Sequence, residues 1–331
     1  MLFYFKDKKT FVTKAVCEGI TYKLVESVWT DISEITCKNS DAVQGDEFVF
    51  TSDGWIAMLT SVQHDGDSML VKARKIDYMF DRDVCFTFGT SQPCEWTLLY
   101  YVKNWFIEGQ DEEYNYRFLN FSRDTLEAKP MKPPATNGVF NVKSYIARIR
   151  RLNQVFTSYV VNGDVLTVHV YHEVRGQKTL VTTNVPVEVI EESFGREQVA
   201  KVSTYSFDGQ GWVFADDLTH WYLMKDGSVS NDALSGERAE GTWRFAQVQN
   251  EDVPENVARN IFAENGYTHK VVVRVPDDYA IYNFYDPVRV EVNNHVYMSY
   301  VSKKIRTSEG YVEYTFGNMK TSLSDKINEE E

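Results

Sequence analysis

The stretch GDEFVFTSDGWIAMLTSVQHDGDSMLVKARKI, residues Gly45–Ile76, contains three short β-strand patterns joined by two turn signals. An Asp-Gly pair stands at positions 53–54 and another at 65–66, and such pairs are typical of β-hairpins. From Met69 onward, apolar and more polar residues alternate, as expected for a strand with one buried face. The sequence therefore predicts a three-stranded meander, the building unit of a small barrel or sandwich.

A similar pattern recurs near the other end of the chain, in YDPVRVEVNNHVYMSYVSKKIRTSEGYVEYTFGN, residues Tyr285–Asn318. Asp286 opens this segment as Asp46 opens the first, and an Asn-Asn pair and a Glu-Gly pair supply its turns. The second strand of each segment holds a Met and a Ser: Met58 and Ser61, then Met298 and Ser302. Because turn positions and strand lengths agree, we interpret the segments as an internal duplication. Chance similarity between two meanders stays open as the alternative.

Two helices are predicted after the first meander. Pro93 suits an early helical position and is followed by EWTLLYYVKNWFIEG, with apolar residues at helical spacing. Asn141 can cap the second helix, whose apolar stripe consists of Val142, Tyr145, Ile146, Ile149 and Leu152. Arg148, Arg150 and Arg151 lie largely outside that stripe. A solvated helix face explains these arginines better than a site for an acidic partner.

The chain from Val155 to about Arg244 has an antiparallel β pattern. Its strongest turn signal is the Asn-Gly pair at positions 162–163. A third helix is predicted to open at Asp252, because Glu255 three residues later completes a capping box and Pro254 suits the first turn.

Composition narrows the classes of function. The net charge of −13 and the pI near 5.0 argue against a nucleic-acid binder and against adhesion to an anionic membrane. No apolar stretch is long enough to cross a bilayer, and the N-terminus lacks the pattern of a signal peptide. The four cysteines are scattered, so we expect reduced core thiols rather than a zinc or redox motif: Cys17, Cys37, Cys85 and Cys94.

The sequence contains few candidate catalytic or metal-binding residues. His169 and His172, beside Glu173, lie three apart in a predicted strand, so they should point to opposite faces and not share a metal. Asp81 and Asp83 could share a face as paired carboxylates, but a turn or solvated edge is the better interpretation. We therefore predict a protein that is not an enzyme, with no catalytic, cofactor-binding or metal-binding residue and no cofactor.

The final stretch, VYMSYVSKKIRTSEGYVEYTFGNMKTSLSDKI, is similar to the C-terminal end of siphophage tail hub proteins. The residues that carry this likeness are Phe316-Gly317-Asn318, followed by Thr321, Leu323, Asp325 and Lys326. The segment Gly54–Val84 resembles the first barrel of the same proteins, including its Phe-Asp pair at positions 80–81. The middle of the chain fits the family only loosely.

The resemblance implies a mainly β (α+β) fold of baseplate-hub type, with two small β-barrels and α+β segments between them. It implies domains at 1–95 (first barrel), 96–265 (helical connector and β-rich middle domain) and 266–323 (second barrel), and a disordered tail at 324–331. Longer relatives carry a lytic extension after this point. The chain stops soon after Lys326, so their lytic activity is not carried over.

The function implied is that of a structural virion protein, the central trimeric hub of a tail tip or baseplate. Such a hub is made in the host cytoplasm and sits at the distal end of the tail. It joins the distal tail protein ring, the tape measure protein and tip or fibre proteins, and encloses a channel through which DNA passes without specific binding. An acidic channel surface would repel the phosphates. We expect no membrane insertion by this chain.

Two other assignments stay open. A host cell-wall carbohydrate-binding tail module could use the aromatic rings of Trp212, Trp221, Tyr222 and Trp243 for stacking. A hexameric distal tail protein with one barrel and an added lobe is the other, although the second barrel-like segment argues against it.

Overall fold

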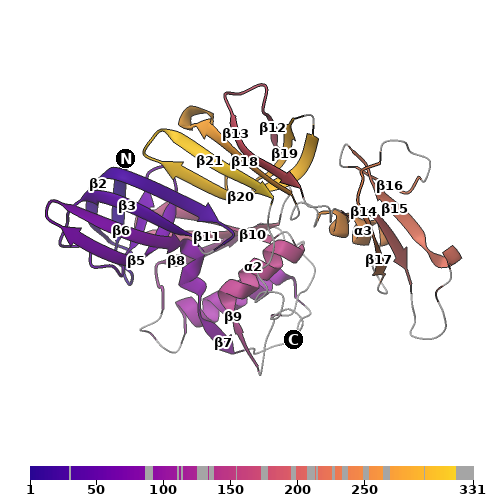
Figure 1. The fold of residues 1–331 in the computed structure, drawn as a ribbon. Helices are drawn as coiled ribbons and strands as arrows, with labels where there is room; N and C mark the ends of the chain where they lie inside the picture. The colour runs from indigo at the N-terminus through magenta and orange to yellow at the C-terminus, as the bar shows by residue number, and fades with distance from the viewer. Residues whose placement is uncertain are drawn as a thin grey trace. The chain divides into compact units, whose positions relative to one another are not determined.

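The computed structural model is mainly β, which confirms the predicted fold class (Figure 1). It describes residues 1–29, 31–85, 92–109, 112, 115–124, 133, 138–153, 155–172, 178–194, 199–206, 213, 215–225, 228–232, 238–248, 253–263, 269–293 and 295–317. Contacts divide the chain into two compact units. Met1–Val174 and Ile305–Gly310 belong to the first, and Arg175–Lys304 with the strand that starts at Tyr311 belong to the second.

The first unit begins with a closed six-stranded β-barrel. Its strands are β1 (Leu2–Lys6), β2 (Thr13–Ser27), β3 (Ile32–Lys38), β4 (Phe48–Thr51), β5 (Ile56–Asp65) and β6 (Ser68–Lys75). Their order is β1-β4-β5-β6-β3-β2, and β2 pairs with β1 again, so the sheet has no free edge. The predicted turns are confirmed: Gly54 and Gly66 take the positive φ that these tight turns require.

Apolar side chains from every strand fill the barrel. Phe3, Phe5, Ile35, Met69 and Val71 have no solvent exposure, and they alternate along their strands with outward-facing residues. Gly19 on β2 leaves room for a ring, because a Cβ there would stand 2.5 Å from Cε2 of Phe3. The barrel interior is therefore a packed core.

The rest of the first unit is helical with short strands. The elements are η1 (Ile76–Phe80), β7 (Asp83–Cys85), α1 (Cys94–Val102), η2 (Lys103–Ile107), β8 (Leu119–Arg123), β9 (Val139–Asn141), α2 (Val142–Asn153), β10 (Val155–Asn162) and β11 (Val165–His172). Both predicted helices are confirmed, and a π-helical turn, η2, extends α1. Asn141 caps α2 as predicted: its Oδ1 accepts the N–H of Ser144 at 3.1 Å. The Asn-Gly hairpin between β10 and β11 is also confirmed.

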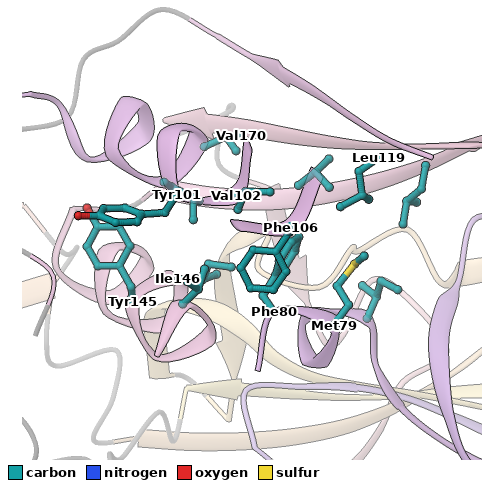
Figure 2. Close-up of a cluster of buried hydrophobic side chains, with 14 of the residues drawn as sticks. Met79, Phe80, Tyr101, Val102, Phe106, Leu119, Tyr145, Ile146 and Val170 are labelled. Carbon is teal, nitrogen blue, oxygen red and sulfur yellow. The ribbon is translucent and has the colours of Figure 1, made fainter. Parts of the chain in front are cut away.

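A second hydrophobic core joins the helices to the outer face of the barrel. Figure 2 shows part of it, with Tyr101 and Phe106 from the α1–η2 segment beside Tyr145 and Ile146 from α2. Phe48 of β4 belongs to the same cluster. The apolar stripe predicted for α2 is therefore its buried face, as far as its side chains are described.

One arginine contradicts the prediction of a solvated α2 face. Arg150 is only 8% exposed, and its guanidinium lies 3.2 Å from the carboxylate of Asp77 in η1. Arg148 is half-buried, and the Arg151 side chain lies outside the described residues. Spacing along the helix identified the apolar stripe, but it did not reveal that a buried carboxylate lay within reach of Arg150.

Lys6 ties the barrel to the β10–β11 hairpin. Its ammonium, almost fully buried, donates to the carbonyl oxygens of Phe11 and Gly163, both at 2.8 Å, and to Oδ1 of Asp164 at 3.1 Å. All three donor hydrogens are thus used, which is what a buried ammonium needs.

We expect Lys6→Met to lower the free energy of unfolding by about 1–3 kcal/mol, because the buried carbonyl oxygen of Phe11 loses its donor and the hairpin loses the contact at Gly163. Urea unfolding followed by circular dichroism measures this change. Lys9→Met is the matched control, because Lys9 is exposed and should tolerate the change. Equal stability of the two variants would show that the Lys6 contacts contribute nothing.

The second unit contains another six-stranded sheet. Its strands are β12 (Lys178–Val181), β13 (Glu188–Phe194), β18 (His269–Pro276), β19 (Pro287–Val292), β20 (His295–Thr307, whose last residues belong to the first unit) and β21 (Tyr311–Gly317). The order is β12-β19-β20-β21-β18-β13. Its buried core includes Val271, Val290 and Tyr314.

The two sheets follow the same plan. When the strands of each sheet are numbered along the chain, both have the order 1-4-5-6-3-2, and β4-β5-β6 corresponds to β19-β20-β21. Both segments of the predicted repeat are therefore three-stranded antiparallel meanders in equivalent places. The sheets differ at one strand, because β12 runs parallel to β19 whereas β1 runs antiparallel to β4. Within the described part of the chain, no β12–β13 pairing closes the second sheet.

A smaller layer lies between the second and third strands of that sheet in sequence. It consists of β14 (Val199–Tyr205), β15 (Thr219–Leu223), β16 (Val229–Ser230) and β17 (Thr242–Gln247), ordered β16-β15-β14-β17, with α3 (Pro254–Ala263) on one face. β14 and β17 are parallel, so the prediction of a purely antiparallel region is wrong here. The third helix is confirmed, although its predicted cap Asp252 lies outside the described residues. Short 3-10 turns are η4 (Ala215–Asp217) and η6 (Asp277–Tyr279).

The predicted domain boundaries at residues 95, 265 and 323 stay a prediction, as does the tail at 324–331, which lies outside the described residues. Among the helices that are described, none has the length and apolar character needed to cross a membrane.

Candidate assembly surfaces

The two aspartates weighed as a paired-carboxylate site are held by neighbouring side chains. Nδ2 of Asn141 donates to Oδ1 of Asp81 at 3.0 Å and to Oδ1 of Asp83 at 3.1 Å. Lys143 pairs with Asp81 at 2.6 Å. The carboxylates therefore join β7 to the start of α2 at a solvated edge, the interpretation that the sequence favoured.

His169 takes part in a cross-strand chain. Its Nδ1 lies 2.6 Å from Oγ of Ser122, its register partner on β8, and its Nε2 lies 3.2 Å from Oδ1 of Asp124. Ser122 and Asp124 are exposed at the edge of the sheet. We interpret these three side chains as a polar contact between paired strands and not as an activated nucleophile. The side chains of His172 and Glu173 lie outside the described residues.

Three of the four cysteines are buried as predicted, and Cys85 is exposed. Burial raises the pKa of the Cys37 thiol to about 12 and raises that of Cys17 as well. Both thiols therefore stay protonated and unreactive inside the barrel. Among the described residues, no cluster of His, Cys, Asp and Glu could hold a metal ion.

The aromatic residues named for stacking occupy different environments. Trp221 lies on the α3 side of the small sheet, where its Nε1 donates to Oγ1 of Thr204 at 3.1 Å. Tyr222 is 7% exposed, and Trp243 is 50% exposed. Trp212 lies outside the described residues. Sequence reasoning missed Phe245, which is 57% exposed two residues after Trp243.

The first barrel exposes a row of apolar side chains on its outer surface. Leu2 on β1 and Val16 and Ile20 on β2 are each about half exposed, at 48%, 50% and 54%. β1 and β2 are neighbours in register, so these side chains lie on one face, called here the β1–β2 apolar row. Glu18, the register partner of Leu2, lies on the same face between Val16 and Ile20 and pairs with Lys38. Exposed apolar groups that gather on a rigid sheet are typical of protein interfaces.

The arrangement of strands and helices is shared with solved structures. Prophage tail protein gp18 from Listeria monocytogenes EGD-e matches with a TM-score of 0.52 at 12% identity, over 98% of this chain and 96% of that one. The fold is that of prophage tail proteins. The 43 kDa tail protein of prophage MuSo2 from Shewanella oneidensis agrees, with a TM-score of 0.51 at 9% identity, over 95% of this chain and 97% of that one.

A chain of the P2 virion baseplate in its activated conformation also matches, with a TM-score of 0.49 at 12% identity, over 95% of this chain and 98% of that one. No protein-family model matches the sequence, and no curated protein matches it. At such low identities the likeness establishes the fold and transfers no individual residue role.

Proposed function

We propose that this protein is the central hub of a phage tail tip or baseplate, a structural virion protein and not an enzyme. The observation that carries the proposal is the repeated six-stranded plan, in which two sheets of one chain share the strand order 1-4-5-6-3-2. The shared fold with prophage tail proteins supports a place in the tail.

A duplicated six-stranded sheet has a consequence for assembly. Three copies of a chain with two sheets of the same strand order present six similar units around one axis, so a trimer can meet a six-fold ring. In this proposal the trimer joins the distal tail protein ring to tip or fibre proteins, with the tape measure protein above it. The β1–β2 apolar row is the surface through which one subunit contacts the next.

The acidic balance of the chain suits a channel for DNA. A net charge of −13 would repel phosphates if part of it lines the lumen, so DNA could pass without adhering. The electrostatic potential at the channel surface of an assembled ring tests this proposal, and a neutral or basic channel would contradict it.

The mass of the protein in solution tests the proposed trimer. By light scattering on a sizing column we expect about 115 kDa, three times the chain mass of 38.3 kDa. A hexamer would instead indicate a distal tail ring. A monomer at all concentrations would show that the chain alone does not form the ring.

The apolar row can be tested in the same experiment. We expect the double variant Val16→Asp and Ile20→Asp to be monomeric, because two buried carboxylates would be placed in the interface. Val160→Asp is the matched control, since Val160 is 55% exposed on β10 and outside the row. A trimer that survives the double change would exclude this surface.

A further inference from the structure

The small sheet of the second unit exposes two large aromatic rings on the face opposite α3. Trp243 and Phe245 alternate outward along β17, and their ring centroids lie 4.8 Å apart at an interplanar angle of 32°. The ammonium of Lys201, the register partner of Trp243 on β14, lies 3.9 Å from the indole centroid. We call Trp243, Phe245, Lys201 and the adjacent His220 the aromatic platform.

The indole is held in place from below. Nε1 of Trp243 donates to Oγ of Ser203 at 2.6 Å, and Ser203 is fully buried. The same hydroxyl lies 2.6 Å from Nδ1 of His220. Since Ser203 accepts from the indole, its own hydrogen is free to go to His220, whose ring is then neutral with its proton on Nε2. The exposed ring is thus oriented before any ligand arrives, which lowers the entropic cost of binding.

The pKa of His220 agrees with a neutral ring. Burial, with the positive charge of Lys201 beside it, lowers the pKa of His220, so the imidazole is neutral at physiological pH. Its Nε2–H is then a hydrogen-bond donor beside the two exposed rings, and the Lys201 ammonium is a donor over the indole. Hydroxyl groups of a ligand lying on the rings would be within the reach of such donors.

We propose that the aromatic platform binds carbohydrate, specifically a pyranose whose equatorial substituents leave a flat face of C–H bonds. The C–H face would lie on the exposed aromatic surface, while Lys201 and His220 donate to ring substituents. Two exposed aromatic rings, with one donor over the indole and another beside it, match a ligand that is apolar on its faces and polar around its rim.

The size of the platform favours a small ligand over a protein partner. An aromatic side chain buries roughly 150–250 Å² when fully covered, so two half-exposed rings offer about 200 Å² of apolar contact. A standard protein interface needs about 800 Å² on each side. A saccharide of a few rings can bind on the smaller apolar area that the two aromatic rings offer. This inference rests on the sheet alone and does not depend on the hub assembly.

Saturation-transfer NMR on the full-length chain tests the proposal. The probes are the β-1,4-linked tetrasaccharide of N-acetylglucosamine and a panel of purified bacterial wall polysaccharides. We expect saturation to reach the axial C–H protons of at least one probe, with saturable binding. Trp243→Ala should weaken that binding by about ten-fold or more, the loss that corresponds to about 1.4 kcal/mol, and Trp243→Phe should weaken it less.

Tyr279→Ala is the matched control, because Tyr279 is an aromatic residue of the same unit that is 49% exposed outside the sheet. It should leave binding unchanged. The proposal is overturned if no probe binds saturably up to about 10 mM, or if Trp243→Ala binds as the unmodified chain does. Loss of affinity for a purified tail protein, without sugar binding, would assign the platform to protein docking instead. The solution mass of Trp243→Ala should be unchanged, so failure here leaves the hub proposal standing.

Discussion

Replacing Asp77 with asparagine is expected to lower the free energy of unfolding by about 3–5 kcal/mol, the cost of breaking a buried ion pair from one side. Asp77 is 6% exposed and lies in η1, between the barrel and the helices. Its carboxylate pairs with Lys75 at 2.6 Å and Arg150 at 3.2 Å, and it accepts the hydroxyl of Tyr159. The amide would remove the negative charge that lies beside both cations in the interior.

The pH dependence gives an independent test of this network. Burial alone would raise the pKa of Asp77, but the charges of Lys75 and Arg150 outweigh it and hold the pKa well below the usual 3.8. A lowered pKa in the folded state means that the carboxylate stabilises the fold at all pH values above 3.8, and that this contribution is lost as pH falls further. The difference in free energy of unfolding between the unmodified chain and Asp77→Asn should therefore be largest at pH 7 and should decrease toward pH 3.

Urea unfolding at the two pH values measures both effects. Asp81→Asn is the matched control, because it makes the same chemical change in an ion pair that is partly exposed, and it should cost less than about 1 kcal/mol. Adding Lys75→Met to Asp77→Asn should recover part of the lost free energy of unfolding, since one of the two buried cations beside residue 77 is removed. Equal midpoints for Asp77→Asn and Asp81→Asn would contradict a buried network.

Local signals in the sequence predicted the local structure well. The Asp-Gly pairs at 53–54 and 65–66, the Asn-Gly pair at 162–163 and the Glu-Gly pair at 309–310 each mark a hairpin, because glycine takes a positive φ at no steric cost, as at Gly163 and Gly310. The asparagine cap and the apolar stripe of α2 follow equally from short-range patterns. The repeat of two meanders was visible for the same reason.

Pairings between distant segments could not be predicted in the same way. β12 and β13 join the second sheet through partners about a hundred residues away, β19 and β18, and no periodicity records which strand will be a neighbour. The burial of Arg150 and of Asp77 has the same origin, because each becomes tolerable only where the other lies. Likewise, Trp221 and Trp243 look alike in sequence, and only the position of α3 decides which ring is covered.

The loop that leads into β4 depends on one buried carboxylate, and its removal is the second large effect we expect. Glu47 has no solvent exposure, and Oε2 accepts the backbone N–H groups of Gln44, Gly45 and Asp46 at 3.1, 2.8 and 3.0 Å. Oε1 pairs with Lys14 of β2 at 2.6 Å. Three successive N–H groups around one anion form a nest that fixes the backbone of the loop.

Glu47→Ala should lower the free energy of unfolding by about 3 kcal/mol or more, because the three N–H groups lose their acceptor. The free energy of unfolding of Glu47→Gln should lie between those of Glu47→Ala and the unmodified chain, since one acceptor oxygen remains but the negative charge is lost. Glu18→Ala, which removes an exposed partner of Lys38 from the same barrel, is the control and should change little.

Acid should weaken the same loop in the unmodified chain. Burial works to raise the pKa of Glu47, but Lys14 and the backbone donors outweigh it and lower the pKa below 4.5. The stabilisation by this carboxylate is thus complete above pH 4.5 and is lost as pH falls through the lower value of the folded state. Hydrogen exchange of the amides of Gly45 and Asp46 measures this directly. Their protection should collapse in Glu47→Ala at pH 7 and persist in Glu18→Ala, and equal protection in both variants would show that the loop is held by other contacts.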